Sequence, residues 1–562
     1  MPTARTAASD DGDGPVDVVV LGSGCAGLLT ALAAADAGAR VEVHEKSDLL
    51  GGTTALSSGV AWLPANRLQR EHGVQDSVPE ARAYLESLSN DLIDPAMTEA
   101  FLEAVDPMLE WVESRTPLRM RLVPGYPDYH PEFPGGKPGG GRSTEPELFS
   151  FDQIGDWADR FLGVRRSMHV GETPVGGGTG FLAPEEEERR AARRLEGLGR
   201  GLLGALLKGL LDRGVRVVTS SRATDLVVEQ GRVVGVRLEG GPDGDREVRA
   251  TRGVVLATGG FERDPGLVRD FLRGPLHHPP GAPSNTGDGL RMAMKVGARL
   301  GMMREAWWAP VVTIPGVPGE QHAGHGVQLV QRERTLPRTI MVNDQGRRFT
   351  NEAANYNALG GAFHEFHPTS FRYENEPAWV VFDQGFVDRY GGYGFAAGDD
   401  VPGWIHRADS VAALADLVGL PPDALVATVE RWNQVCAGGR GRDLDHGRGE
   451  SAYDGWCGDR SHYPGRAATL GPLDQAPYYA SPVHSSALGT KGGPRTTVDC
   501  EVLDVDGDVV GGLWAVGNAM AAPTGMVYGG AGGTLGPAMV FGYRCGLSAA
   551  GRPFERQGST HA

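Results

Sequence analysis

The chain has 562 residues, a net charge of −17, and 40% hydrophobic and 22% charged residues. This length exceeds one ordinary hydrophobic core, so we expect two or more domains in a globular protein. The negative charge disfavours nucleic acid and anionic membranes as partners, and no apolar run reaches the roughly 20 residues of a transmembrane segment. The five cysteines are scattered without metal-ligand spacing, which favours reduced thiols, a cytoplasmic location and no bound metal. Residues 1–14 are polar and acidic, and we expect them to form a disordered leader.

The N-terminal segment has the pattern of a dinucleotide-binding βαβ unit. Residues 16–21 (VDVVVL) predict a buried parallel strand, residues 22–27 (GSGCAG) follow directly, and an Ala/Leu-rich helix then ends at Gly38. A second strand, 40–44, is followed by an acidic residue. The first glycine of the motif permits a tight turn, and the second lets the backbone approach a pyrophosphate. The third lets helix and strand pack closely. The acidic residue after the second strand accepts hydrogen bonds from a ribose. The residues expected to hold the dinucleotide here are Gly22, Gly24, Ala26, Gly27 and Glu45.

Three further segments distinguish between the possible dinucleotides. Residues 46–59 are rich in small residues and hydroxyls that suit an extended cofactor, and segments 254–260 (VVLATGG) and 512–519 (GLWAVGNA) predict buried strands that end in small residues. Strand ends this far apart in sequence suit a long cofactor and one domain assembled from both ends of the chain, so we predict FAD. The corresponding contact residues are Lys46, Gly52, Thr53, Thr54, Ser58, Gly59, Ala257, Thr258, Gly259, Gly517 and Asn518.

These motifs, together with the later segment GGTLGPAMVFGYRCG, resemble the fumarate reductase/succinate dehydrogenase flavoprotein superfamily, and within it the 3-ketosteroid Δ1-dehydrogenases. The resemblance runs from about residue 16 to residue 550. It implies an α/β fold: a Rossmann-like FAD-binding domain (15–285 and 468–552) with an inserted α+β catalytic domain (286–467). Residues 553–562 are expected to be a disordered tail. Asn285 and the four residues after it mark the crossing between domains or, more simply, a helix cap.

The reaction that the resemblance implies removes two hydrogens from carbons 1 and 2 of a 3-ketosteroid. The proton on carbon 2 is acidic only if the ketone oxygen is polarised by hydrogen-bond donors, and carbon 1 then gives a hydride to the flavin N5 atom. The protein therefore needs a base, donors at the ketone and the flavin. The acceptor that reoxidises the flavin is left open among a quinone, a protein and oxygen.

Site residues are carried over from the family onto matching positions. In the segment 526–537, Tyr528 and the backbone N–H of Gly532 match the donors to the ketone, and a helix entered at Pro537 directs its positive end toward the flavin. Tyr356, in the block RRFTNEAANY, matches the base, and Tyr129 matches the tyrosine that assists it, with Tyr126 as the alternative. In the same block, Arg348 and Glu352 form either a bracing ion pair or a solvated pair. The resemblance adds Gly533 and Leu535 to the cofactor contacts.

Two alternatives use the same flavin. A 3-ketosteroid 4(5α)-dehydrogenase needs the same ketone site with a different base placement, and a fumarate-reductase-like enzyme needs cationic side chains that clamp a small unsaturated acid. The segment around His484 resembles the histidine segment of the superfamily, yet it continues as LGTKGG, as in the steroid enzymes. No histidine lies between Lys46 and Asn66, which disfavours a covalent flavin and predicts non-covalent FAD. The three tyrosines disfavour a flavin carrier without turnover.

Overall fold

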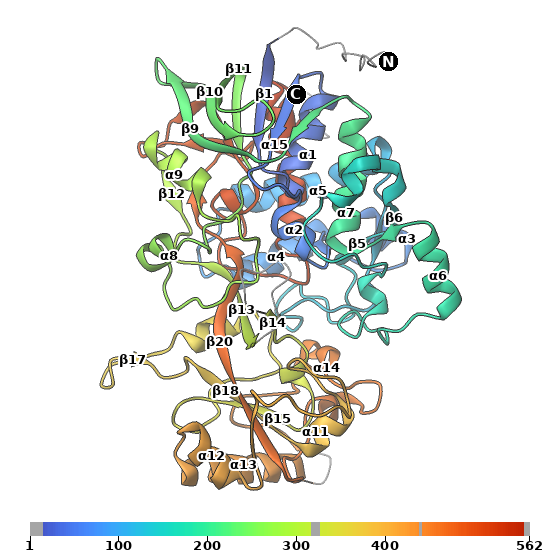
Figure 1. The fold of residues 1–562 in the computed structure, drawn as a ribbon, viewed down its shortest axis with the longest axis vertical. Helices are drawn as coiled ribbons and strands as arrows, with labels where there is room; N and C mark the ends of the chain where they lie inside the picture. Colours follow the sequence, from blue (N-terminus) through green and yellow to red (C-terminus); the bar gives the residue numbers. More distant parts are fainter. Residues whose placement is uncertain (1–14, 316–325, 438–440, 556–562) are drawn as a thin grey trace, which may run out of the picture.

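In the computed structural model, which describes residues 15–315, 326–437 and 441–555, the chain forms two domains, each with its own β-sheet (Figure 1). The expected leader, 1–14, and residues 556–562 of the expected tail lie outside the described residues. The start of that tail is ordered, contrary to the prediction. Phe554 lies 6.2 Å from the ring of Tyr543 and under the guanidinium of Arg544 at 4.7 Å. This apolar side chain therefore extends the packing of the last helix.

The first domain is organised around an eight-stranded sheet. Its strands, in spatial order, are β22 (Glu501–Leu503), β23 (Val509–Ala515), β11 (Arg246–Leu256), β1 (Val16–Leu21), β2 (Val41–His44) and β8 (Arg216–Val218), with β10 (Arg232–Gly240) on β11 and β9 (Ser221–Glu229) on β10. β1 runs parallel to both neighbours, with Val19 opposite Val254 and Glu42. Both faces of β1 are buried, which explains its continuous apolar run. Strands from both ends of the chain thus share one sheet.

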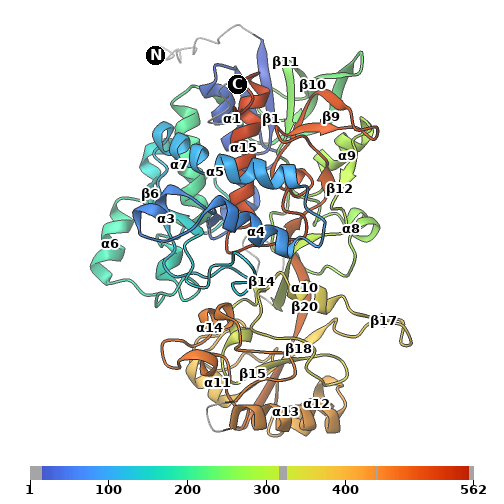
Figure 2. The same cartoon turned by 180° about the vertical axis from the view of Figure 1, so that it is seen from behind.

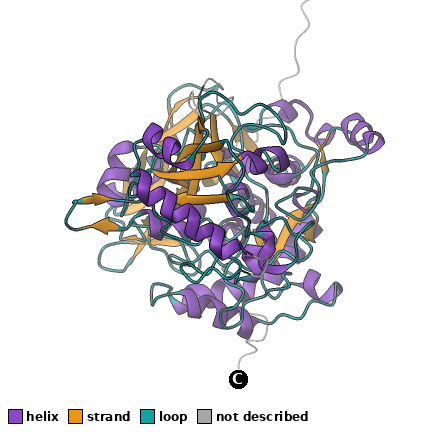
Figure 3. Ribbon diagram, turned by 90° about the horizontal axis from the view of Figure 1, so that it is seen from below, coloured by secondary structure: helices purple, strands orange, loops and turns teal. Residues whose placement is uncertain are grey.

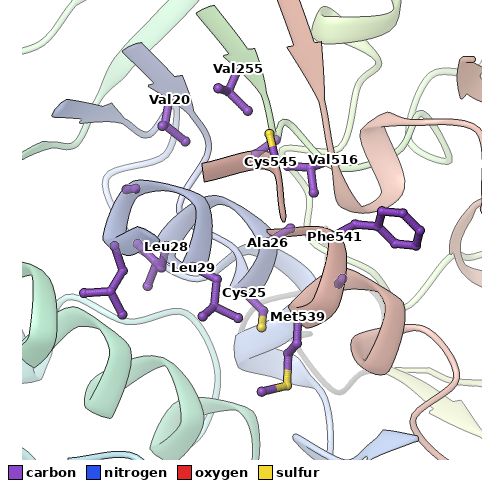
Figure 4. Close-up of a cluster of buried hydrophobic side chains, with 14 of the residues drawn as sticks. Val20, Cys25, Ala26, Leu28, Leu29, Val255, Val516, Met539, Phe541 and Cys545 are labelled. Carbon is purple, nitrogen blue, oxygen red and sulfur yellow. The ribbon is translucent and has the colours of Figure 1, made fainter. Parts of the chain in front are cut away.

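Two helices from opposite ends of the chain pack together against this sheet. α1 (Cys25–Asp36) and α15 (Leu535–Ala549) lie side by side, and the close-up in Figure 4 shows Leu28 and Leu29 of α1 near Met539 of α15. The hydroxyl of Thr30 donates to the carbonyl of Gly542 at 3.2 Å. Such a contact requires that the two backbones approach closely, which the glycines of α15 allow. The remaining helices of this domain are α2 (Gly52–Leu56), α3 (Arg67–Glu71), α4 (Val78–Leu88), α5 (Pro95–Arg115), α6 (Pro184–Ala192), α7 (Leu198–Leu211), α8 (Pro265–Phe271) and α9 (Asp288–Lys295), several of which face the viewer in Figure 2.

The second domain contains a six-stranded antiparallel sheet. Its strands, in spatial order, are β14 (Gly326–Leu329), β13 (Ala306–Ile314), β20 (Tyr478–Thr490), β18 (Ala378–Asp383) and β15 (Thr339–Val342), with β19 (His406–Ala408) also on β20. Helices α12 (Val411–Val418) and α13 (Pro422–Cys436) cover one face, as the view from below shows (Figure 3). The other helices here are α10 (Leu359–Phe363), α11 (Gln384–Arg389) and α14 (Ala452–Cys457).

The predicted domain boundaries, 286 and 467, differ from this arrangement. α9 remains with the first domain, because Lys295 pairs with Asp225 of β9 at 3.2 Å. β20, assigned by sequence to the FAD-binding domain, pairs instead with β13, β18 and β19. The second sheet is therefore built from residues 306–490. A short sheet of β3 (Ala61–Trp62), β4 (Met120–Leu122) and β5 (Ser143–Pro146) completes the first domain near the junction. Within the described residues, every helix is too short or too polar to cross a bilayer.

Candidate functional site

A cavity of about 700 Å³ is lined by residues of both domains. It brings together most of the residues predicted from sequence, although they come from five separate stretches of the chain. The predicted residues that line it are Gly22, Gly24, Ala26, Glu45, Lys46, Gly52, Thr53, Thr54, Ser58, Tyr129, Ala257, Thr258, Gly259, Tyr356, Gly517, Asn518, Tyr528, Gly532 and Leu535. The alternative tyrosine, Tyr126, lines it too.

The turn between β1 and α1 supplies one end of this cavity. Gly22 has a φ of +112°, and a Cβ there would lie 2.3 Å from the carbonyl oxygen of Ala257 on the adjacent strand. Glycine is thus required by both conformation and space. The N-cap of α1, Gly24, has no side-chain cap, and the first turn of the helix carries no acidic residue. The positive end of α1 is therefore available to a phosphate in the cavity.

Glu45, after β2, is buried and held in one orientation. Its Oε2 accepts hydrogen bonds from the Ser23 backbone N–H (3.0 Å) and hydroxyl (2.7 Å), and its Oε1 accepts one from the Ser47 N–H (2.9 Å). A carboxylate oxygen has two lone pairs, so Oε1 retains capacity for a ribose hydroxyl. Ser23 was missed by the sequence analysis, which treated it as the spacer of the glycine motif.

A polar network formed by α2 and the loops before α8 and α9 also faces the cavity. Asn285 donates to the Thr53 hydroxyl (2.9 Å) and to Oε1 of Glu262 (2.6 Å). The simpler interpretation of residues 285–289 as a helix cap agrees with the structure, because Gly287 is the N-cap of α9; Asn285 lies two residues before that cap. Burial raises the pKa of Glu262 to about 7. The hydroxyl of Thr258, which lines the cavity, is buried without a hydrogen-bond partner in the described chain. Such an orphaned group fits a site that a polar cofactor fills.

Four predicted cofactor residues lie differently from expectation. Gly27, Gly59 and Gly533 do not line the cavity; a Cβ at each would meet Gly22, Leu198 and the Tyr528 ring, respectively, within 2.6 Å. They therefore permit close packing. Lys46 lines the cavity, but its ammonium donates to Thr286 (2.7 Å) and pairs with Asp288 (3.1 Å). Lys46 thus fixes the start of α9 to β2.

Three tyrosines meet at the junction of the two domains. The hydroxyl of Tyr356 donates to that of Tyr528 at 2.9 Å. The ring of Tyr129 lies edge-on to both, with centroids 5.5 Å from Tyr356 and 5.1 Å from Tyr528. Tyr126 packs instead on Trp456, 5.3 Å between centroids, and its hydroxyl is buried without a hydrogen-bond partner in the described chain. The geometry thus favours Tyr129 as the phenol that adjoins the other two.

Burial strongly disfavours the phenolate form of these side chains. It raises the pKa of Tyr356 well above its usual value of 10, and the nearby Tyr528 adds to the increase. Burial likewise raises the pKa of Tyr528, although hydrogen bonds with Thr534 and Tyr356 lower it in part. At neutral pH all three phenols are therefore protonated, and they act as donors until a ligand changes their surroundings.

The backbone of Gly532 lines the same cavity as these hydroxyls. Its φ is +90°, and a Cβ would lie 2.5 Å from the carbonyl of Val60. The Gly532 carbonyl accepts from the N–H groups of Trp62 (3.0 Å) and Gly536 (2.8 Å), whereas its own N–H has no acceptor among the described residues. The cavity therefore contains a backbone N–H and phenol hydroxyls as possible donors to a ligand oxygen.

The segment that carries Tyr356 is braced by a buried ion-pair network, as one of the two sequence interpretations predicts. Arg348 makes two hydrogen bonds of 2.7 Å to Glu352, Arg448 adds a third at 3.2 Å, and Arg348 also pairs with Asp443 at 2.8 Å. Burial alone would raise the pKa of Glu352, but Arg348 and Arg448 outweigh it and the net direction is downward. The carboxylate therefore stays ionised and fixes the loop four residues before Tyr356.

Lys491 is a further site residue that the sequence analysis quoted without assigning a role. Its ammonium donates to the carbonyls of Met526 (2.6 Å) and Val527 (3.2 Å) and lies 4.1 Å from the ring centroid of Trp307. Burial lowers its pKa to about 7. Lys491 therefore supports the loop that carries Tyr528. The motif LGTKGG drew attention to Lys491, but its contact with Met526 joins residues that are 35 apart, and no local sequence pattern shows that contact.

The part of the cavity beside the tyrosines has mostly apolar walls from both domains. Trp307 of β13 lies 5.0 Å from Tyr528 and donates its indole N–H to Asn518 at 3.0 Å. Aliphatic side chains form much of the remaining lining: Val60, Val170, Val175, Ile314, Val327, Leu329 and Leu488. Such walls suit a rigid apolar ligand with one polar oxygen.

The fold and cavity define a two-domain dinucleotide-binding protein, and residues 17–535 match the FAD binding domain family. The chain is 39% identical over 584 residues to a 3-oxosteroid 1-dehydrogenase of Mycobacterium tuberculosis, covering 96% of this chain and 99% of the relative. It is also 39% identical over 546 residues to a 4-oxocyclohexanecarboxylate 2-dehydrogenase of Sinomonas cyclohexanicum, covering 95% and 93%. The crystal structure of 3-ketosteroid delta1-dehydrogenase from Sterolibacterium denitrificans in complex with 1,4-androstadiene-3,17-dione superposes with a TM-score of 0.86 at 33% identity, covering 95% and 99%.

The chain therefore belongs to the family of FAD-dependent oxidoreductases that contains the 3-oxosteroid 1-dehydrogenases. The resemblance inferred from the motifs and the choice of FAD over other dinucleotides are both confirmed.

Proposed function

We propose that this protein catalyses the 1,2-dehydrogenation of 3-ketosteroids. The observation that carries the proposal is the pair of hydroxyls of Tyr356 and Tyr528, 2.9 Å apart, in one cavity with the free N–H of Gly532 and an apolar wall. A ketone oxygen placed between Tyr528 and Gly532 receives two hydrogen bonds. These stabilise the negative charge that develops on the oxygen as carbon 2 loses its proton.

Tyr356, in its phenolate form, accepts that proton in the proposed mechanism and becomes the neutral phenol. Its hydrogen bond to Tyr528 places the two phenols within reach of adjacent atoms of one ring, the carbonyl oxygen and the neighbouring carbon. Tyr129, edge-on to both rings, assists by positioning Tyr356 and by excluding water. Bound FAD supplies the acceptor for the hydride that leaves carbon 1. The proton and the hydride together account for the two hydrogens and two electrons removed.

FAD is proposed to bind without a covalent bond. Glu45 would hold the ribose, the start of α1 would hold the pyrophosphate, and Asn518 and Thr258 would contact the rest of the cofactor. The one histidine of this lining, His44, has both ring nitrogens engaged, with Ser221 (3.0 Å) and Glu42 (3.1 Å). Acid precipitation of the purified protein is expected to leave the yellow flavin in the supernatant; flavin retained in the pellet would contradict this.

A second candidate substrate is a small cyclic keto acid. It is favoured by the equal identity to the 4-oxocyclohexanecarboxylate 2-dehydrogenase and by exposed Arg166 in the cavity lining, which could bind a carboxylate. The steroid is preferred because most of the other lining near the tyrosines is apolar.

The test supplies purified holoenzyme with an artificial electron acceptor and, in parallel, androst-4-ene-3,17-dione, a 5α-saturated 3-ketosteroid, 4-oxocyclohexanecarboxylate and succinate. Formation of the 1,4-diene with the highest kcat/KM supports the proposal. A 4-ene formed from the 5α-saturated steroid, with no 1,2-dehydrogenation of either steroid, would assign the 4(5α) reaction instead. Turnover confined to the keto acid or to succinate would replace the steroid altogether.

A further inference from the structure

Two imidazoles and one carboxylate converge outside the cavity, where the two domains meet. His277 lies in the loop after α8, Glu376 immediately precedes β18, and His484 lies on β20. One potential ligand atom from each lies within 4.8 Å of those of the other two. Figure 1 shows β20 running from the junction into the lower domain, with α8 beside its upper end. The dehydrogenation proposed above uses none of these side chains.

The carboxylate is positioned for both imidazoles at once. Oε1 of Glu376 lies 2.8 Å from Nδ1 of His484 and 3.7 Å from Nε2 of His277. Its Oε2 accepts a hydrogen bond of 2.6 Å from the Ser485 backbone N–H. This outer hydrogen bond fixes the carboxylate plane and leaves Oε1 facing the histidines, an arrangement common among metal-bound carboxylates.

The carboxylate of this cluster is buried and fixed, whereas the imidazoles are partly open to solvent. The Glu376 side chain is only 7% exposed, whereas His484 is 21% and His277 45% exposed. The backbone N–H of His277 donates to the Ser485 carbonyl at 2.9 Å, so the loop is attached to β20 even though its imidazole is accessible. An ion could enter from solvent and keep a water ligand.

We propose that His277, Glu376 and His484 bind a Zn²⁺ ion that links the two domains. Zn²⁺ takes nitrogen and oxygen ligands at 2.0–2.2 Å in a tetrahedron, which puts neighbouring ligand atoms about 3.3 Å apart. The two distances to Oε1, 2.8 and 3.7 Å, lie on either side of this value, so a small rotation of exposed His277 completes the geometry. Two imidazoles favour a transition metal over Mg²⁺ or Ca²⁺.

The test titrates ZnCl₂ into EDTA-treated, dialysed holoenzyme by isothermal titration calorimetry and follows Tm in parallel. The expected result is one ion per chain and a rise in Tm of about 2 °C or more near saturation, because the ion binds only the folded state. His277→Ala, an exposed position, and His484→Ala should each weaken binding at least tenfold and remove the rise in Tm. His367→Ala, at a histidine of similar exposure, is the matched control and should bind as the native chain does.

Co²⁺ gives an independent readout. Its ligand-field absorption, measured as a difference spectrum against the flavin, should be that of a tetrahedral ion in the native chain and should disappear in His277→Ala. The proposal fails if the native chain binds no Zn²⁺. It also fails if His277→Ala binds the ion as tightly as the native chain and the His367→Ala control do. Equal competition by Mg²⁺ would also overturn it. All these readouts are independent of steroid turnover.

Discussion

The substitution Tyr356→Phe distinguishes an effect on the catalytic rate from an effect on the stability of the fold. It removes one hydroxyl and keeps the ring that packs on Tyr129 and Tyr528. The lost hydrogen bond, 2.9 Å to Tyr528, contributes about 1 kcal/mol net to stability. Loss of a general base costs about 10²–10⁴ in rate, or roughly 3–5 kcal/mol in the barrier. We therefore expect a folded, yellow protein whose rate loss far exceeds its loss of stability.

The assay is anaerobic stopped-flow reduction of the bound flavin by saturating androst-4-ene-3,17-dione, which isolates the half-reaction from the electron acceptor. Tyr126→Phe is the control, because the Tyr126 hydroxyl is equally buried but has no hydrogen-bond partner in the described chain. We expect Tyr126→Phe to reduce its flavin at the native rate and to be no less stable. Reduction at the native rate by Tyr356→Phe would refute the assignment of the base.

The same half-reaction has an expected pH dependence. Because burial raises the pKa of Tyr356 above 10, the phenolate fraction grows about tenfold for each pH unit below that pKa. The rate of flavin reduction should therefore rise from pH 7 toward pH 9 and remain flat in Tyr356→Phe. A native rate that falls over this range would argue against a phenol as the base.

Three other changes test the supporting structure. Gly22→Ala places a Cβ 2.3 Å from the Ala257 carbonyl, and we expect a protein purified without flavin colour; normal FAD content would contradict the model of the turn. Lys491→Met removes the donor to the loop that carries Tyr528, so kcat should fall at least tenfold while FAD content is retained, and an unchanged kcat would deny its positioning role. Burial raises the pKa of Glu262 from 4.5 to about 7, so the neutral carboxyl stabilises the fold below pH 4.5 and this contribution is lost as pH rises to about 7. Glu262→Gln should abolish that decline, measured by urea unfolding at about pH 5 and about pH 8.

Local patterns were sufficient for the dinucleotide-binding unit. This unit lies in one short stretch of the chain that contains the β-branched run before Gly22, the helix after it and Glu45. Within such a stretch, the period of the apolar residues and the spacing of the glycines predict the structure directly. The glycine at the end of the motif 528–532 also has a physical basis, because Gly532 is required by a positive φ and by a neighbouring backbone, whereas the role of this motif at a ketone stays a prediction. In these places the physical requirement and the sequence signal coincide.

Contacts between distant segments were not predictable in the same way. The pattern at 285–289 correctly indicated a helix cap, but the side-chain partners of Asn285, Thr53 and Glu262, are 232 and 23 residues away, and no local pattern shows them. Tyr126 and Tyr129 are three residues apart in an irregular loop, and only tertiary packing distinguishes them: Tyr126 packs on Trp456, and Tyr129 on Tyr356 and Tyr528. The predicted boundary near 467 differs from the strand pairing because pairing across 95 or more residues leaves no local period.

The long strand β20 has a practical consequence for engineering. It ends at Thr490, whose hydroxyl accepts from the Phe261 N–H of the first domain at 3.1 Å, and the next residue supports the Tyr528 loop. A chimera that exchanges the second domain between relatives must therefore transplant 306–491 as one piece. A junction at 467 would take the central strand of the second sheet, β20, from one parent and the other strands of that sheet from the other parent. Because residues before and after 467 line the cavity, its walls would also come from two different proteins.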